Sequence, residues 1–171
     1  MKENRDFPPV LQELHKLDFD YSEGKGIDFE PLSQFLSAKE TKQWIRAWTG
    51  NKKLDGTEYK IFGEDGSGGY AAFWLVRQEA DILEQPIVFF GSEGEIAVIA
   101  SNFNDYLWLL AGDIGPCEVV NYPELRKPAN AQFTKFAKKY SSSKHLDPWE
   151  VVAKAQAEFP DFEEKIEALC E

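Results

Sequence analysis

The stretch with the clearest potential for chemistry is GEDGSGGYAAFWLV, residues 63–76, in which four of the first seven residues are glycine. A glycine-rich loop can cradle phosphate, but a Walker-type loop (G-x-x-x-x-G-K-[ST]) needs a lysine to neutralise it. Here Gly69 and Tyr70 stand in place of the lysine and the hydroxyl, and Glu64 and Asp65 add negative charge inside the loop. A dinucleotide loop would precede a helix, whereas the following residues are typical of a strand. The glycines therefore predict a hairpin turn.

The histidines and cysteines do not form a recognisable catalytic or metal-binding pattern. His15 and His145 have no HxxxH or HExxH partner, and Cys117 and Cys170 lack CxxC spacing, so no zinc site is predicted. A thiol nucleophile needs a histidine base, and GDIGPCE around Cys117 nominates none. We expect Cys117 to be a small, buried or half-buried residue. We further expect a protein that is not an enzyme and needs no metal, nucleotide or flavin.

The acidic residues gather in the segments expected to form turns. The chain has 30 Asp and Glu against 19 Lys and Arg, and the segment 56–118 holds eleven acidic residues against two basic ones. This balance would repel DNA or RNA and attract a basic protein. It would also keep the protein soluble, and both explanations stay open. The candidate protein-binding residues are Glu64 and Asp65 in one turn, Glu93 and Glu95 in another, and Asp81 and Glu84 in the connection between them, all expected to be solvated.

Length and composition favour a single soluble domain of 171 residues. The longest apolar runs, YAAFWLV and YLWLLA, are far shorter than the roughly 20 residues of a membrane span. The start, MKENRDFPPV, is polar and is not typical of a secretory signal. Two distant cysteines fit a reducing compartment. We therefore expect a cytoplasmic protein with no membrane partner.

Helical patterns flank the middle of the chain. In SAKETKQWIRAWTG, Ser37 and Glu40 have capping-box spacing and Gly50 is placed to end a helix over 38–49. A helix over 102–111 is expected with Ser101 as its N-cap. The other helices are expected in PPVLQELHKL, in ANAQFTKFAKKY, in DPWEVVAKAQAEF with Asp147 as cap, and from Pro160 to Leu169.

The middle of the chain predicts strands. TEYKIFG and GYAAFWLV are joined by EDGSG, and PIVFFG and EIAVIA are joined by SEG, which indicates two successive hairpins. The prediction is an α+β domain with a central antiparallel sheet of about four or more strands, built from residues 57–100. N- and C-terminal helices pack on this sheet, with the helices on one face.

The strand expected in GYAAFWLV has apolar residues on both of its sides. Alternation places Tyr70 and Trp74 on one side and Ala71 and Phe73 on the other, so both sides of this strand are apolar. Two alternatives follow. Either the second face lies at an interface with another molecule, or the C-terminal helices cover it.

Three stretches, in order, resemble the SUKH superfamily, which contains yeast cell-wall assembly regulators and many bacterial immunity proteins. They are WIRAWTGN, IFGEDGSGGYAAFWLV and QPIVFFGSEGEIAVIASNFNDYLWLLAGDIGP; AQAEFPDFEE is also similar to tails in that group. The resemblance marks a core over residues 32–118 and a helical C-terminal extension over 119–171. The Leu-Pro and aromatic residue common near the start of family members are not recognisable in DFEPLSQFL.

The resemblance implies an α+β fold that binds protein and has no catalytic residues. In bacteria it implies neutralisation of a polymorphic toxin, frequently a nuclease, by direct binding. The acidic charge agrees with this role, because the face of a nuclease that attracts nucleic acid tends to be basic. The alternative is an intracellular adaptor or regulatory protein of the same fold with no link to a toxin.

Overall fold

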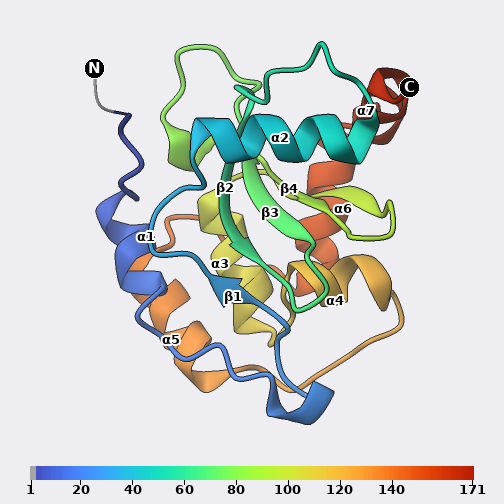
Figure 1. Ribbon diagram of the computed structural model, residues 1–171. Coiled ribbons are helices and arrows are strands. Elements are labelled where there is room, and N and C mark those ends of the chain that lie inside the picture. Colours follow the sequence, from blue (N-terminus) through green and yellow to red (C-terminus); the bar gives the residue numbers. More distant parts are fainter. Residues whose placement is uncertain (1–2) are drawn as a thin grey trace.

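The computed structural model describes residues 3–171; the first two residues of the polar start lie outside this range. Its strands are β1 (Glu30–Pro31), β2 (Tyr59–Glu64), β3 (Tyr70–Trp74), β4 (Ile87–Phe90) and β5 (Ile96–Ala100). Within the described range they form one five-stranded antiparallel sheet in the order β1-β2-β3-β4-β5 (Figure 1). The predicted α+β class and the predicted sheet are therefore confirmed.

Helices precede and follow the sheet as the sequence patterns predict. The α-helices are α1 (Pro9–Leu14), α2 (Ala38–Thr49), α3 (Phe103–Ala111), α4 (Pro116–Asn121), α5 (Ala131–Tyr140), α6 (Pro148–Glu158) and α7 (Phe162–Leu169). Two short 3-10 helices, η1 (Ser22–Gly24) and η2 (Ile82–Glu84), lie in connecting segments. β1 and α4 were not predicted from the sequence, because both are short and have no periodic pattern.

The glycine-rich stretch is a hairpin turn, as predicted. β2 and β3 pair antiparallel with Glu64 opposite Tyr70, and the chain reverses between them. Gly68 has a φ of +96°, a conformation that residues with a side chain rarely adopt. Gly63 lies within β2, where a Cβ atom would come within 2.0 Å of the Phe29 ring. The glycines thus serve the turn and the close packing of β2.

Helix ends follow the predicted caps with one exception. α2 begins at the Ser37–Glu40 capping box and ends at Gly50 in the left-handed conformation. α3 is capped by Asn102, whose side chain accepts from the amide of Asp105, and not by Ser101 as predicted. The Ser101 hydroxyl is buried and has no hydrogen-bond partner among the described residues. The prediction chose the wrong one of two adjacent residues that are both good N-caps.

Helices cover both faces of the sheet, so the prediction that they pack on one face is wrong. Alternate residues of β3, Ala71 and Phe73, pack into one core with α1, α3 and α5. On the opposite face, Ala72 and Trp74 pack with α2 and α7. α6 contributes to both cores beside β5, at the edge of the sheet. The second apolar face is therefore covered within the chain, by α2 together with the C-terminal helices α6 and α7.

Candidate protein-binding face

The sheet brings its two hairpin turns to the same end of the molecule. Tyr70, the first residue of β3, pairs with Phe90, the last residue of β4. The β2–β3 turn (65–69) and the β4–β5 turn (91–95) must therefore lie side by side. A hydrogen bond of 3.0 Å between the hydroxyls of Ser67 and Ser92 joins them. We call this end the turn face: residues 64–69 and 91–95, with the adjoining segments 20–28 and 116–122.

The turn face contains four of the six acidic residues predicted to bind a partner. Glu64 and Asp65 belong to the first turn, and Glu93 and Glu95 to the second. Asp81 and Glu84 lie in the β3–β4 connection, which leaves β3 at its other end. The length of β3 separates this connection from the turn face by about 14 Å, at ~3.4 Å per residue. The predicted set is therefore two separate groups.

Asp65 is only 5% exposed, so it is not solvated and the prediction for this residue is wrong. Its Oδ1 accepts from the amides of Ser67 and Gly69 and from the Ser67 hydroxyl, at 2.7–2.9 Å. Burial raises the pKa of Asp65, but these hydrogen bonds together outweigh it and hold the pKa below its usual value. Asp65 therefore builds the turn. Of its neighbours on this face, Glu93 is exposed as predicted, whereas Glu64 and Glu95 are half-buried.

Asp81 and Glu84 lie at exposed positions in the β3–β4 connection, and each takes part in local structure. The side chain of Asp81 accepts a hydrogen bond of 2.9 Å from the amide of Leu83 and caps η2. The backbone carbonyl of Glu84 accepts from the guanidinium of Arg77, which also pairs with Glu158 of α6. These contacts hold the connection against α6.

Two carboxylates that the sequence analysis did not select join the turn face to its neighbours. The Asp28 carboxylate accepts from the amide of Gly66 in the β2–β3 turn at 2.9 Å. Glu118 of α4 accepts from the amides of Asp28 and Gly115, each at 3.1 Å. Residues 18–30 hold five acidic residues, one lysine and Tyr21, and this acidic, aromatic composition was the signal in the sequence.

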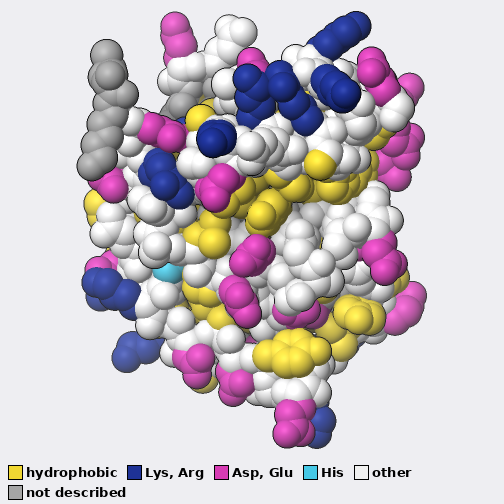
Figure 2. Space-filling model, viewed as in Figure 1, with side chains coloured by type: hydrophobic (Ala, Val, Ile, Leu, Met, Phe, Trp, Pro, Cys, Tyr) yellow, Lys and Arg dark blue, Asp and Glu magenta, His cyan; other side chains and the backbone are white. Residues whose placement is uncertain are grey.

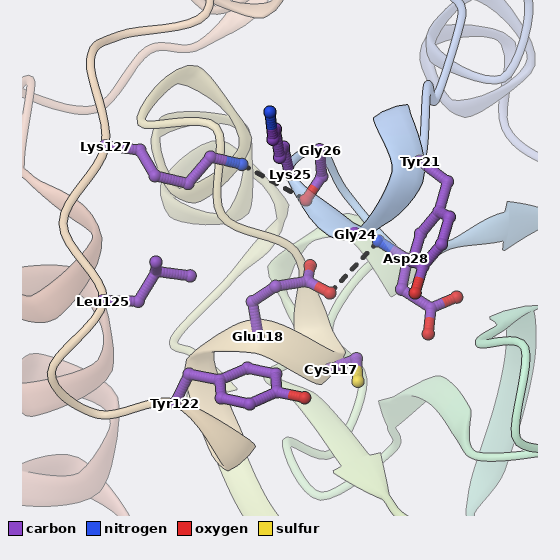
Figure 3. Close-up of a pocket in the computed structure, with 10 residues that line it drawn as sticks. All are labelled: Tyr21, Gly24, Lys25, Gly26, Asp28, Cys117, Glu118, Tyr122, Leu125 and Lys127. Atoms are coloured by element: carbon purple, nitrogen blue, oxygen red, sulfur yellow. Dashed lines mark hydrogen bonds between the residues drawn. The ribbon is translucent and has the colours of Figure 1, made fainter.

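Between the segment 20–28, α4 and the residues that follow it lies a hollow of about 400 Å³, shown in Figure 3. We call it the tyrosine hollow, because Tyr21 and Tyr122 line it and are 55% and 57% exposed. Figure 3 shows Glu118 in the middle of the hollow, Tyr122 along one side and Tyr21 beside Asp28. The other lining residues are Gly24, Lys25, Gly26, Cys117, Leu125 and Lys127.

The charged side chains of the tyrosine hollow differ in whether they are free to bind a ligand. Lys127 pairs with Asp113 at 2.7 Å and donates to the backbone carbonyl of Gly26 at 3.2 Å. Glu118 is 6% exposed, and burial raises its pKa although its two amide hydrogen bonds act in the opposite direction. Asp28 uses one carboxylate oxygen for Gly66, and its Oδ2 has no hydrogen-bond partner among residues 3–171. Asp28 thus has a free acceptor.

Cys117 lies in the wall of this hollow and is half-buried, as predicted. Burial raises the pKa of the thiol to about 12, and the nearby charges of Glu118 and Asp65 contribute less to this rise. The protonated thiol is a poor nucleophile. His15 stacks among phenylalanine rings and His145 on Trp108; neither makes a hydrogen bond to Cys117 within the described chain. This arrangement does not activate the thiol.

Figure 2 shows charged side chains of both signs on this side of the molecule. Lys and Arg side chains gather at the top, over α2, whose basic residues include Lys39, Lys42 and Arg46. Asp and Glu side chains lie at the top as well and are spread over the middle and the lower end of the fold, where a few Lys and Arg side chains also lie. The residues of the turn face itself include eight Asp and Glu against one lysine, so a partner that approaches this face meets mainly negative charge.

Comparisons with protein-family models, with curated proteins and with solved structures found no match. Within residues 3–171, no three His, Cys, Asp or Glu side chains are grouped so that they could hold a metal ion. No helix of the described chain has the length and apolar character that a membrane span requires.

Proposed function

We propose that this protein binds a basic protein partner through the turn face and acts by that binding, without catalysis. The observation that carries the proposal is the joining of the two hairpin turns by Ser67 and Ser92. This contact gathers Glu64, Glu93 and Glu95 at one end of a rigid sheet. Exposed charges on such a face raise the rate of association with an oppositely charged partner.

The chemistry of the face supports binding over catalysis. Its thiol is held protonated, and its most buried carboxylates, Asp65 and Glu118, are engaged by backbone amides. Exposed tyrosines beside the carboxylates favour recognition of protein, because Tyr, Trp and Arg dominate the energy of protein interfaces. The tyrosine hollow adds a concave element to this end of the fold.

The biological role that we propose is that of an immunity protein, which neutralises a polymorphic toxin domain, such as a nuclease, inside the cell. The resemblance of residues 32–118 to the SUKH superfamily supports this role, as does the negative charge of the segment 56–118. A basic toxin would be steered to the turn face. An adaptor or regulator would use the same face for a different partner.

Affinity purification of the tagged protein from its native cell, with identification of the bound protein, tests the proposal. We expect a basic protein that is released as the salt concentration rises. A matched purification uses the variant Glu64→Lys/Glu93→Lys/Glu95→Lys, which should recover less of it. Equal recovery by both proteins would contradict the turn face as the binding site. A gene for the partner directly beside the gene for this protein would indicate immunity, and its absence an adaptor.

A further inference from the structure

The tyrosine hollow has features of a binding site that the acidic turns alone do not have. The large apolar side chains that are exposed in the described chain are Tyr21, Val76, Tyr122 and Tyr140. Two of these four line this one hollow. Exposed aromatic rings on opposite parts of a concave surface cost solvation free energy, and a ligand that covers them recovers it.

The polar groups of the hollow specify the charge of that ligand. Asp28 has an unused carboxylate oxygen, and the buried carboxylate of Glu118 adds negative potential to the middle of the hollow. The positive charge of Lys127 is neutralised by Asp113. Lys25 extends its ammonium to the side away from Tyr122 and Cys117 (Figure 3). These charges favour a cation over an anion as the ligand.

The rings further specify the kind of cation. A guanidinium is planar, stacks on aromatic faces and binds a carboxylate through two N–H groups. An ammonium is a compact and strongly hydrated charge that uses a carboxylate but gains less from stacking. A volume of about 400 Å³ is at the small end for ligand pockets, which suits one inserted side chain.

We propose that the tyrosine hollow receives an arginine side chain of the protein partner. The guanidinium stacks against Tyr21 or Tyr122 and donates hydrogen bonds to Asp28 from the open side of the hollow. This inference rests on the proposed function, since it names a residue type that the partner presents to the turn face. Arginine in an aromatic pocket is a typical energetic centre of an interface.

The first test uses the full chain and a small probe. N-acetyl-arginine N-methylamide is titrated into ¹⁵N-labelled protein, with the citrulline analogue as a neutral probe of the same shape. We expect saturable shifts confined to residues lining the hollow, at least about fivefold weaker for citrulline. The lysine analogue should bind more weakly than arginine. Equal binding of arginine and citrulline, or shifts spread over α2, would overturn the assignment.

Variants of the two tyrosines and of Asp28 separate the contributions. Tyr21→Leu/Tyr122→Leu keeps apolar surface but removes the rings, and should weaken the arginine probe about fivefold. Tyr21→Phe/Tyr122→Phe should restore it. Asp28→Asn retains an acceptor for Gly66 and should weaken the probe about tenfold. The exposed Tyr140 lies outside the hollow, so Tyr140→Leu is the matched control and should bind like the wild type.

The same variants distinguish failure of this inference from failure of the proposed function. A basic partner that binds the leucine double variant as tightly as the wild type would overturn the arginine pocket and leave the turn face standing. Binding of the arginine probe with no protein recovered from the native cell would support the pocket and count against the proposed function. Loss of partner binding in the leucine variant, restored in the phenylalanine variant, would support both.

Discussion

The hydroxyl of Ser92 donates a hydrogen bond of 3.0 Å to the hydroxyl of Ser67, which in turn donates one of 2.7 Å to the buried carboxylate of Asp65. This chain of two bonds crosses from the β4–β5 turn to the β2–β3 turn. It joins the two turns beside which Glu64, Glu93 and Glu95 lie. The turn face is therefore a preorganised surface, and its charge can be changed without altering its backbone.

Reversing the glutamate charges of the turn face should slow association with a basic partner. In Glu64→Lys/Glu93→Lys/Glu95→Lys the steering attraction is lost, so we expect an association rate at least about tenfold lower at low salt. The difference should shrink as salt screens the charges. Stopped-flow or surface-binding kinetics at several salt concentrations measure it. The control is Asp81→Lys/Glu84→Lys at the far end of the sheet, which should have a smaller effect.

Asp65 should matter for stability more than its charged neighbours do. Asp65→Ala leaves the amides of Ser67 and Gly69 without their acceptor, so we expect the free energy of unfolding to fall by about 2–3 kcal/mol. Asp65→Asn keeps an acceptor oxygen and should lose less. Glu93→Ala, at an exposed position, should change stability by less than about 0.5 kcal/mol. Urea unfolding measures all three, and an Asp65→Ala variant as stable as the wild type would contradict the assigned role.

The contrast between Glu93 and Asp65 shows what the sequence could predict about the site. The turns were predictable because glycines and strand patterns mark them locally. The burial of Asp65 was not, because it depends on how Gly69 and the β4–β5 turn close over it. Asp28 and Glu118 lie 90 residues apart and meet only in the folded chain. Contacts between distant segments leave no periodic signal in a single sequence.

In the fold too, features marked by local residues could be predicted from the sequence, and contacts between distant segments could not. α2 was predictable to the residue, because Ser37, Glu40 and Gly50 mark both of its ends. The two-residue strand β1 is defined only by its pairing with β2, Glu30 opposite Glu64. Which helices cover which face depends on α6, which packs beside β5 and supplies residues to both cores. Such coverage is a property of tertiary packing, and local pattern left two alternatives open.

An ion pair between α3 and α6 should contribute to that packing. Asp105 is fully buried; its Oδ2 accepts from Lys154 at 2.8 Å, and its Oδ1 has no hydrogen-bond partner among the described residues. In Lys154→Met the carboxylate loses its counter-charge, and we expect a loss of about 2 kcal/mol. The expected loss of stability is smaller than for a fully buried ion pair, because the Lys154 side chain is 49% exposed. Thermal or urea unfolding measures the loss.

A second variant shows whether that loss comes from the charge. Asp105→Asn combined with Lys154→Met removes both charges and retains the shape of the Asp105 side chain. It should be more stable than Lys154→Met alone, since no unpaired charge remains buried. If the double variant is the less stable of the two, the effect of Lys154 arises from its packing and not from the ion pair.

His15 should make the protein less stable in mild acid. Burial lowers its pKa from 6.5 to about 4, although the hydrogen bond to the Leu32 carbonyl acts in the opposite direction. Its contribution to stability is therefore present above pH 6.5, where both states hold it neutral. It is lost as the pH falls toward 4, because the unfolded chain takes up a proton that the folded chain refuses. We expect a loss of about 3 kcal/mol over this range.

The ring environment makes this prediction specific to His15. Four phenylalanine rings, which do not titrate, surround it at centroid distances of 5.0–6.3 Å: Phe7, Phe19, Phe29 and Phe62. Its Nε2 is buried and has no hydrogen-bond partner among residues 3–171. His15→Asn should be less stable than the wild type at pH 7 because it packs less well. It should nevertheless lose about 3 kcal/mol less between pH 7 and pH 4, as measured by urea unfolding. A His15→Asn profile parallel to the wild type would refute the assignment.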